Sequence, residues 1–256
     1  MTLELKEVLE AHRLPAEEIQ LRARKIYTEM LTRSRHLRVG NFTAIDTDDL
    51  RRGFELYDQA FFAGSLMRQL DATPLAFRLS KRMTKAAGKV TRRQMSNRGE
   101  SRAYEITVST TLLFQTFRGE NRPILLSGIH CRDRLEALQR VLEHEIVHLA
   151  EWLTWDDTSC SASRFQSIAG HLFGHTEHRH QLITPYEHAQ IQYGIRPGDR
   201  VTFQFEERSY TGIVNRITRR ATILVEDPRG ESYTDGKRYR KFYVPLSLLR
   251  KAQPTS

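Results

Sequence analysis

The chain has 256 residues, of which 39% are hydrophobic, and a formal net charge of +9. This hydrophobic fraction is enough to bury a core, which excludes a disordered chain, and the length accommodates one large or two modest domains. No apolar run is long enough to span a membrane, and the first seven residues alternate acids with leucines instead of forming a secretory signal. We therefore expect a cytoplasmic protein that does not enter a membrane.

The two cysteines, Cys131 and Cys160, are too few for a disulfide framework and too far apart for a Cys-x-x-Cys motif. Both are expected to be core thiols in a reducing compartment. The positive charge favours polyanionic partners, because clustered Lys and Arg side chains release counterions when they meet phosphates.

Helical spacing of apolar residues dominates the first part of the chain. Residues 1–48 are predicted to be a helical accessory segment. A stronger helix begins near Asp49 and ends at Gly64, with one apolar stripe formed by Leu50, Phe54, Tyr57, Phe61 and Phe62. Three short strands are predicted next, at residues 75–79, 88–91 and 104–109, because each is rich in apolar or β-branched residues.

Two further helices are predicted at residues 133–153 and 163–173, the second ended by Gly174. The pattern changes after residue 190, where turn residues such as Pro197 and Gly198 separate short runs of strand type. We interpret residues 49–190 as one domain and residues 194–252 as a small β barrel of the SH3-like sort. The expected fold class is α+β.

The segment His144-Glu145-Ile146-Val147-His148 carries the chemistry. Residues four apart lie on the same face of a helix, so His144 and His148 can present two imidazole nitrogens to one zinc ion. Such an ion lowers the pKa of its water to about 7, and Glu145 is placed to act as the general base. The alternative interpretation is a chance occurrence of a five-residue motif on an amphipathic helix.

A catalytic zinc ion takes a third protein ligand and keeps an open fourth position. His175 is the first choice for this ligand, because a loop just after Gly174 can fold back towards the helix. Other candidates follow or precede it in the chain: His171, His178 and His180, and the carboxylates Glu151, Asp156 and Asp157.

Several segments together resemble the SprT-like zinc metallopeptidases, which include the Spartan group that cleaves proteins crosslinked to DNA. They are residues 56–66 (LYDQAFFAGSL), 80–83 (SKRM) ahead of Ala87 and Gly88, 106–109 (ITVS) and 144–148. The resemblance covers roughly residues 50–180.

This resemblance implies a small zincin-like (minigluzincin) core of helices on a three-stranded sheet, with His144 and His148 as zinc ligands and Glu145 as the catalytic acid and base. The chain departs from the family at two points. The family usually takes its third histidine from a His-Gly-x-x-aromatic segment, whereas residues 161–165 (SASRF) keep only the aromatic residue. The frequent C-terminal zinc ribbon is also missing. Either the ligand has moved, for instance to His175, or the site is degraded.

A basic stretch lies between Arg78 and Arg102, with nine Lys or Arg residues against one acid, Glu100. We predict that it holds a phosphate backbone beside the active-site groove through Arg78, Lys81, Arg82, Lys85, Lys89, Arg92 and Arg93. The C-terminal module adds a mixture of cations and aromatic residues suited to phosphate contact and base stacking: Arg216, Arg219, Arg220, Lys237, Arg238, Arg240 and Lys241, with Tyr233, Tyr239, Phe242 and Tyr243. The alternative is that these cations are solvated strand edges.

The leading hypothesis is a zinc-dependent endopeptidase that acts on DNA-associated proteins. The second is a nucleic-acid-binding or regulatory protein that kept the scaffold and lost hydrolysis. A metal-dependent hydrolase that acts on a substrate other than a peptide is the third.

Overall fold

The computed structural model describes residues 4–94, 102–119 and 122–252. The chain forms two compact units, Met1–Leu182 and Ile183–Ser256. Both are described below by themselves.

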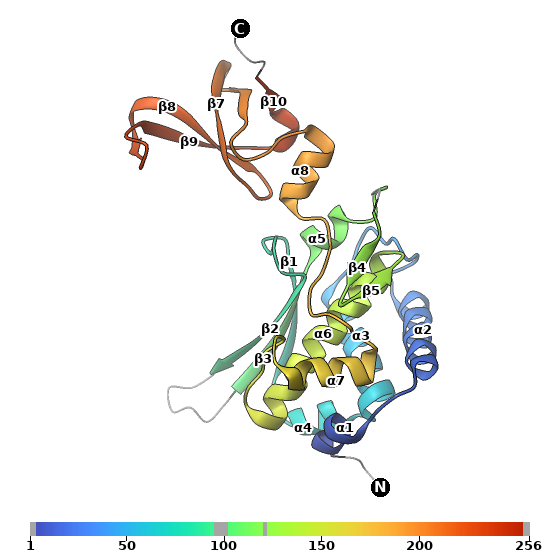
Figure 1. The fold of residues 1–256 in the computed structure, drawn as a ribbon. Helices are drawn as coiled ribbons and strands as arrows, with labels where there is room; N and C mark the ends of the chain where they lie inside the picture. The colour runs from blue at the N-terminus through green and yellow to red at the C-terminus, as the bar shows by residue number, and fades with distance from the viewer. Residues whose placement is uncertain (1–3, 95–101, 120–121, 253–256) are drawn as a thin grey trace. The chain divides into compact units, whose positions relative to one another are not determined.

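The first unit is a mixed α+β structure in which helices surround a small sheet (Figure 1). Its helices are α1 (Leu5–Ala11), α2 (Ala16–Arg33), α3 (Thr47–Phe62), α4 (Ser65–Leu70), α5 (Thr110–Gln115), α6 (Arg134–Trp155) and α7 (Ser163–Phe173). Its strands are β1 (Leu75–Ser80), β2 (Gly88–Gln94), β3 (Arg102–Ser109), β4 (Ile124–Leu126) and β5 (Ile129–Cys131). The three strands and the long helices predicted from the sequence are confirmed.

The central sheet has the strand order β1-β3-β2, with β1 parallel and β2 antiparallel to β3. Helices α3 and α6 pack against it. Alternation along the strands turns Tyr104, Ile106 and Val90 towards the helices, where all three are buried. The sheet thereby places the edge strand β2 directly beside α6, the helix that carries the histidine motif.

Helix α6 has a defined end on each side. The side chain of Asp133 accepts hydrogen bonds from the backbone N–H groups of Leu135 and Glu136 at its start. At its end, Asp156 adopts a left-handed conformation with φ of 60° and closes the last turn. This reversal directs the following segment back towards the histidine-bearing face.

The N-terminal helices belong to the same compact unit as the motif. Helix α2 packs on α3 and α6, and α1 packs on α4 and α6. Their apolar stripes are buried, with Val8 and Met30 at most 1% exposed. The segment expected to be accessory therefore contributes to the core of this unit, and the unit ends at Leu182 instead of residue 190.

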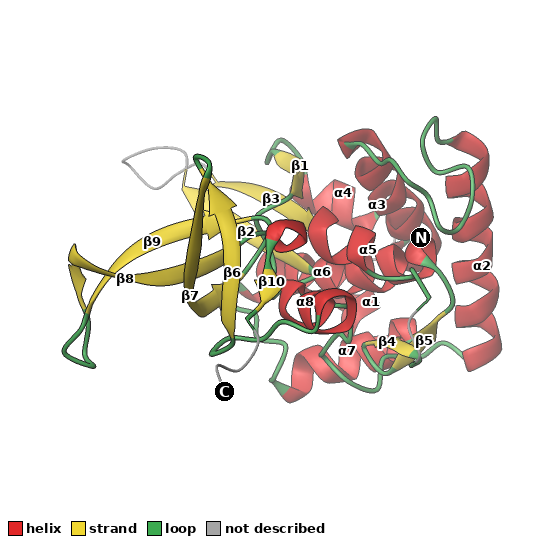
Figure 2. Ribbon diagram, turned by 90° about the horizontal axis from the view of Figure 1, so that it is seen from above, coloured by secondary structure: helices red, strands yellow, loops and turns green. Residues whose placement is uncertain are grey.

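The second unit contains α8 (Pro185–Tyr193), β6 (Arg200–Phe205), β7 (Arg208–Ile217), β8 (Ala221–Ser232), β9 (Arg238–Val244), a 3-10 turn (Leu246–Leu248) and β10 (Arg250–Lys251). The strands form one antiparallel sheet in the order β10-β6-β7-β8-β9, with β8 and β9 as long curved strands (Figure 2). Ala189 of α8 lies in the same buried cluster as Val201 and Ile223, so this helix packs on the sheet.

The prediction of a closed barrel is wrong for the described residues. The two outer strands, β9 and β10, do not pair with each other, and β10 has only two residues, which pair with β6. Alternating burial predicts which side chains face the core, but it carries no information on whether the first and last strands meet. Within the described ranges, no helix is both long and apolar enough to cross a membrane.

Candidate metal centre

Two imidazoles converge on the exposed side of α6. The Nε2 atoms of His144 and His148 are 3.2 Å apart. Tetrahedral zinc with Zn–N bonds of about 2.0 Å requires its nitrogen ligands to be about 3.3 Å apart. The pair therefore already has the separation that a shared ion would require.

A chain of hydrogen bonds fixes the orientation of His148. Its Nδ1 lies 2.6 Å from the hydroxyl of Thr158, which in turn donates to Oε2 of Glu151 at 2.6 Å. Since the Thr158 hydroxyl donates its proton to the carboxylate, it accepts from Nδ1–H of His148. This tautomer leaves the lone pair of Nε2 free, as metal ligation requires.

Both imidazoles are neutral at physiological pH. Burial lowers the pKa of His148 to about 4. Burial, followed by repulsion from neighbouring histidines, lowers the pKa of His144 to about 3. A metal ion competes only with protons that are bound, so this pair offers its nitrogens at no protonation cost near pH 7.

Glu145 points from the same helix towards strand β2. Its carboxylate accepts the backbone N–H of Val90, and burial raises its pKa to about 8. Gly88 makes room for it, since a Cβ at that position would lie 2.5 Å from Oε1 of Glu145. The strand and the helix together therefore hold one buried carboxyl beside the histidine pair.

Cys160 lies next to this pair. Its sulfur and one nitrogen from each of His144 and His148 all lie within 4.8 Å of one another. The residue is half-buried, so the expectation that both cysteines are core thiols holds for Cys131 only. Sequence reasoning missed Cys160 as a candidate ligand, although it directly precedes the segment 161–165 that lacks the family's histidine.

His175, the residue favoured from the sequence as third ligand, lies elsewhere. Its side chain is 1% exposed, and its Nε2 is 2.8 Å from Oε2 of Glu143. The other oxygen of Glu143 accepts from Tyr57 at 2.7 Å and pairs with Arg140 at 2.7 Å. His175 thus completes a buried polar network, and its Nδ1 is outside the cluster of three candidate ligands.

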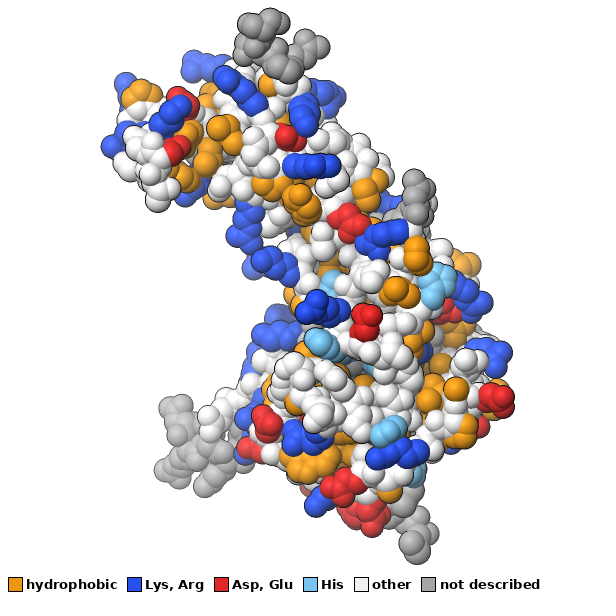
Figure 3. All heavy atoms as spheres, in the orientation of Figure 1, with side chains coloured by type: hydrophobic (Ala, Val, Ile, Leu, Met, Phe, Trp, Pro, Cys, Tyr) orange, Lys and Arg blue, Asp and Glu red, His pale blue; other side chains and the backbone are white. Residues whose placement is uncertain are grey.

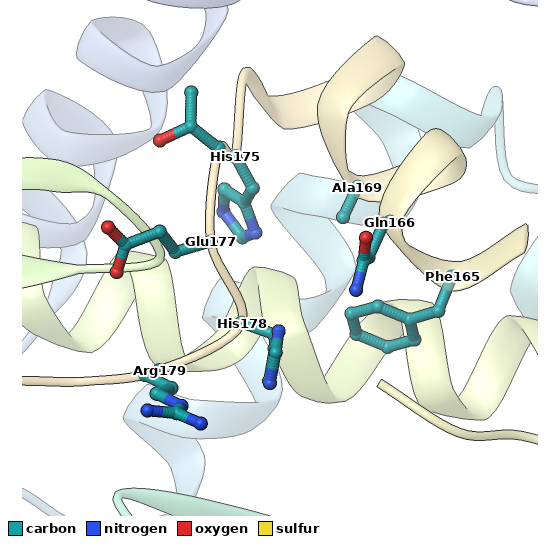
Figure 4. A pocket seen from close by; sticks show the side chains of 8 residues that line it. Phe165, Gln166, Ala169, His175, Glu177, His178 and Arg179 are labelled. Carbon is teal, nitrogen blue, oxygen red and sulfur yellow. The ribbon is translucent and has the colours of Figure 1, made fainter. Parts of the chain in front are cut away.

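The remaining downstream histidines have separate surroundings. His171 contacts Ser167 on α7 at 3.2 Å, and His180 contacts the backbone carbonyl of Lys85 at 2.9 Å. His178 lines a cleft of about 550 Å³, opposite the ring of Phe165 (Figure 4). Because Phe165 also stacks against His148, with ring centroids 4.4 Å apart, this cleft adjoins the histidine pair.

The alternative carboxylate ligands already have basic partners. Glu151 is buried and bonds Arg164 at 2.6 Å, in addition to Thr158. Asp157 also pairs with Arg164, and Asp156 pairs with Arg92 and Arg102. These acids orient the loop that follows α6 and do not point at the imidazoles.

The seven predicted nucleic-acid residues are all exposed but fall into two groups. Arg78 and Arg93 pair with Glu105, and Arg92 pairs with Asp156. Over the part of the chain that is described, the other four have no acidic partner: Lys81, Arg82, Lys85 and Lys89. Arg98 and Glu100 of the basic stretch lie outside the described residues.

In the C-terminal unit, part of the predicted basic surface is neutralised locally. Lys237 pairs with Glu226, and Lys241 pairs with Glu231 at 2.6 Å. Of the aromatic residues, Tyr239 and Phe242 are buried, whereas Tyr243 is 63% exposed. Lys and Arg side chains nevertheless outnumber acids on the face of this unit seen in Figure 3.

Comparison with protein-family models, with curated proteins and with solved structures gives no match for this chain.

Proposed function

We propose that the protein is a zinc-dependent endopeptidase of the SprT-like type, with a zincin-like core in its first unit. The observation that carries this proposal is the pair of neutral imidazoles at 3.2 Å with a buried glutamate on the same helix. The donor set fits zinc, which prefers imidazole nitrogen and leaves an open position in its catalytic sites.

A bound zinc ion would supply Lewis acidity, which polarises a peptide carbonyl and lowers the pKa of a water molecule. Glu145 would accept a proton from that water and deliver it to the leaving amine. Its raised pKa suits both steps, because a base that must also act as an acid works best near the ambient pH.

Strand β2 offers a place for the substrate backbone. The N–H of Val90 points to Glu145 and therefore away from β3. Because backbone groups alternate along a strand, those of Gly88 and Arg92 point to the same free edge. An extended peptide that added to this edge would run past Glu145, and its main chain would be recognised without regard to sequence.

The basic loop between β1 and β2 supports substrates that are bound to nucleic acid. It carries Lys81, Arg82 and Lys85, and His180 ties the loop to the metal side of the unit through the Lys85 carbonyl. Phosphates bound here would hold a DNA-associated protein close to the cleavage site.

The test combines metal analysis with one isosteric substitution. The purified protein is expected to bind one zinc ion and to cleave an unstructured protein substrate. Glu145→Gln should keep the zinc and lose at least about 100-fold in rate, consistent with the removal of a general base. His144→Gln should lose both. Cleavage by Glu145→Gln at the parental rate would refute the mechanism.

The second candidate, a nucleic-acid-binding protein without hydrolysis, is favoured by the four unpaired cations and the missing third histidine. It predicts salt-sensitive binding to DNA that persists in His144→Gln, with no cleavage by the parent protein.

A further inference from the structure

We propose that Cys160 is the third protein ligand of the metal centre, so that the site is built from two imidazoles and one thiolate. The inference rests on the proposed zinc site and names the residue that completes it.

The backbone around Cys160 is a closed turn. The N–H of Ala162 donates to the carbonyl of Ser159 at 2.9 Å, which places Cys160 at the first central position of the turn. The hydroxyls of Ser159 and Ser161 lie 3.0 Å apart across it. The turn therefore presents the Cys160 side chain from a defined backbone.

Both sides of this turn are anchored to the framework of the site. Before it, Thr158 bonds His148 and Glu151. The carbonyl of Asp157 accepts from Arg164 at 3.0 Å, and Arg164 itself pairs with Glu151. The turn is thus fixed to the same two residues of α6 that orient the second imidazole, and the sulfur is carried to the ligand face by a supported segment.

The sulfur is the only additional ligand atom that the described residues bring to the pair. It lies with the two nitrogens inside a 4.8 Å limit. A zinc ion with Zn–S of about 2.3 Å and Zn–N of about 2.0 Å would bring sulfur and nitrogen to about 3.5 Å, which a rotation about one Cα–Cβ bond can supply. The favoured alternative, His175, already uses Nε2 for Glu143.

A thiolate changes the chemistry of the site. It neutralises one of the two positive charges of zinc, and its softness favours zinc or cobalt over magnesium or manganese. One coordination position stays open for water or substrate, as in other catalytic sites with three protein ligands.

Cobalt substitution tests the assignment without any activity measurement. We would load the full chain with Co²⁺ and record the near-ultraviolet absorption, where a thiolate bound to cobalt gives a charge-transfer band. Zinc affinity would be measured by competition with a chromophoric chelator.

The parent protein should show the band. Cys160→Ser should lose it and weaken zinc binding by more than the about 10- to 100-fold cost of removing an outer-shell partner. Cys160→His should restore affinity without the band. Cys131→Ala is the matched control, because Cys131 is the only other thiol, is buried on β5 and should not affect the spectrum.

Two results would overturn the assignment. A parent protein that binds cobalt without a thiolate band, or a His175→Gln variant that alone loses the metal, excludes Cys160 while leaving the zinc site intact. A folded parent protein that binds neither metal refutes the proposed function, and the ligand assignment falls with it. Circular dichroism of each variant separates loss of a ligand from loss of the fold.

Discussion

Glu145→Gln should change how the stability of the metal-free protein depends on pH. Burial raises the pKa of this carboxyl from 4.5 to about 8, and only the Val90 N–H opposes that shift. Between these values the unfolded chain releases the proton while the folded chain keeps it. Stability conferred by the proton is therefore present below pH 4.5 and is lost as the pH rises towards 8.

The size of the effect follows from the shift. A change from 4.5 to about 8 corresponds to about 5 kcal/mol of unfolding free energy, at about 1.36 kcal/mol for each pKa unit. Glutamine has the same shape but no proton to lose. The parent protein should thus lose about 5 kcal/mol more than Glu145→Gln between pH 4.5 and 9.

Urea unfolding of chelator-treated protein, followed by circular dichroism at several pH values, measures this difference. The histidines titrate in both proteins, so their contribution cancels in the comparison. If the parent and the variant lose stability in parallel across the whole range, Glu145 is not a buried carboxyl and the reasoning about its environment is wrong.

Two further predictions concern the surroundings of the site. Thr158→Val removes the acceptor for Nδ1 of His148 and should weaken zinc binding about 10- to 100-fold in a chelator competition, whereas Thr154→Val, which loses only a bond to its own helix, should not; equal affinities would contradict the orienting role. Replacing Lys81, Lys85 and Lys89 together by Gln should lower the salt dependence of binding to a DNA duplex by up to about three contacts, at a slope of about 0.9 each. The matched control is the Arg78→Gln, Arg93→Gln double variant, whose guanidinium groups already pair with Glu105, and a larger loss there would reverse the assignment.

Local patterns in the sequence predicted the elements that build the first unit. Strands β1, β2 and β3 and helices α6 and α7 lie where period-two and helical spacing placed them, because burial of one face controls both patterns. The pair His144 and His148 was visible for the same reason, since four residues make about one helical turn.

Contacts between segments distant in sequence were not predictable in this way. Glu143 is fully buried, and nothing in the local pattern indicates that Tyr57, Arg140 and His175 supply its partners. A buried carboxylate requires such partners, so this network rather than the metal site accounts for the position of His175. The position of Cys160 likewise depends on Arg164 and Thr158, whose contacts form only in the folded chain.

The segment from Asp156 to Ala162 contains both the hydroxyl that supports His148 and the sulfur beside it. Local unfolding of this short segment would remove both at the same moment, while α6 stayed intact. Metal release would then have the free energy of opening this segment as its barrier, and a bound ion would protect the peptide bonds of residues 156–162 from added proteases. The lifetime of the loaded state would thus be set by the mobility of seven residues and not by the strength of the helix.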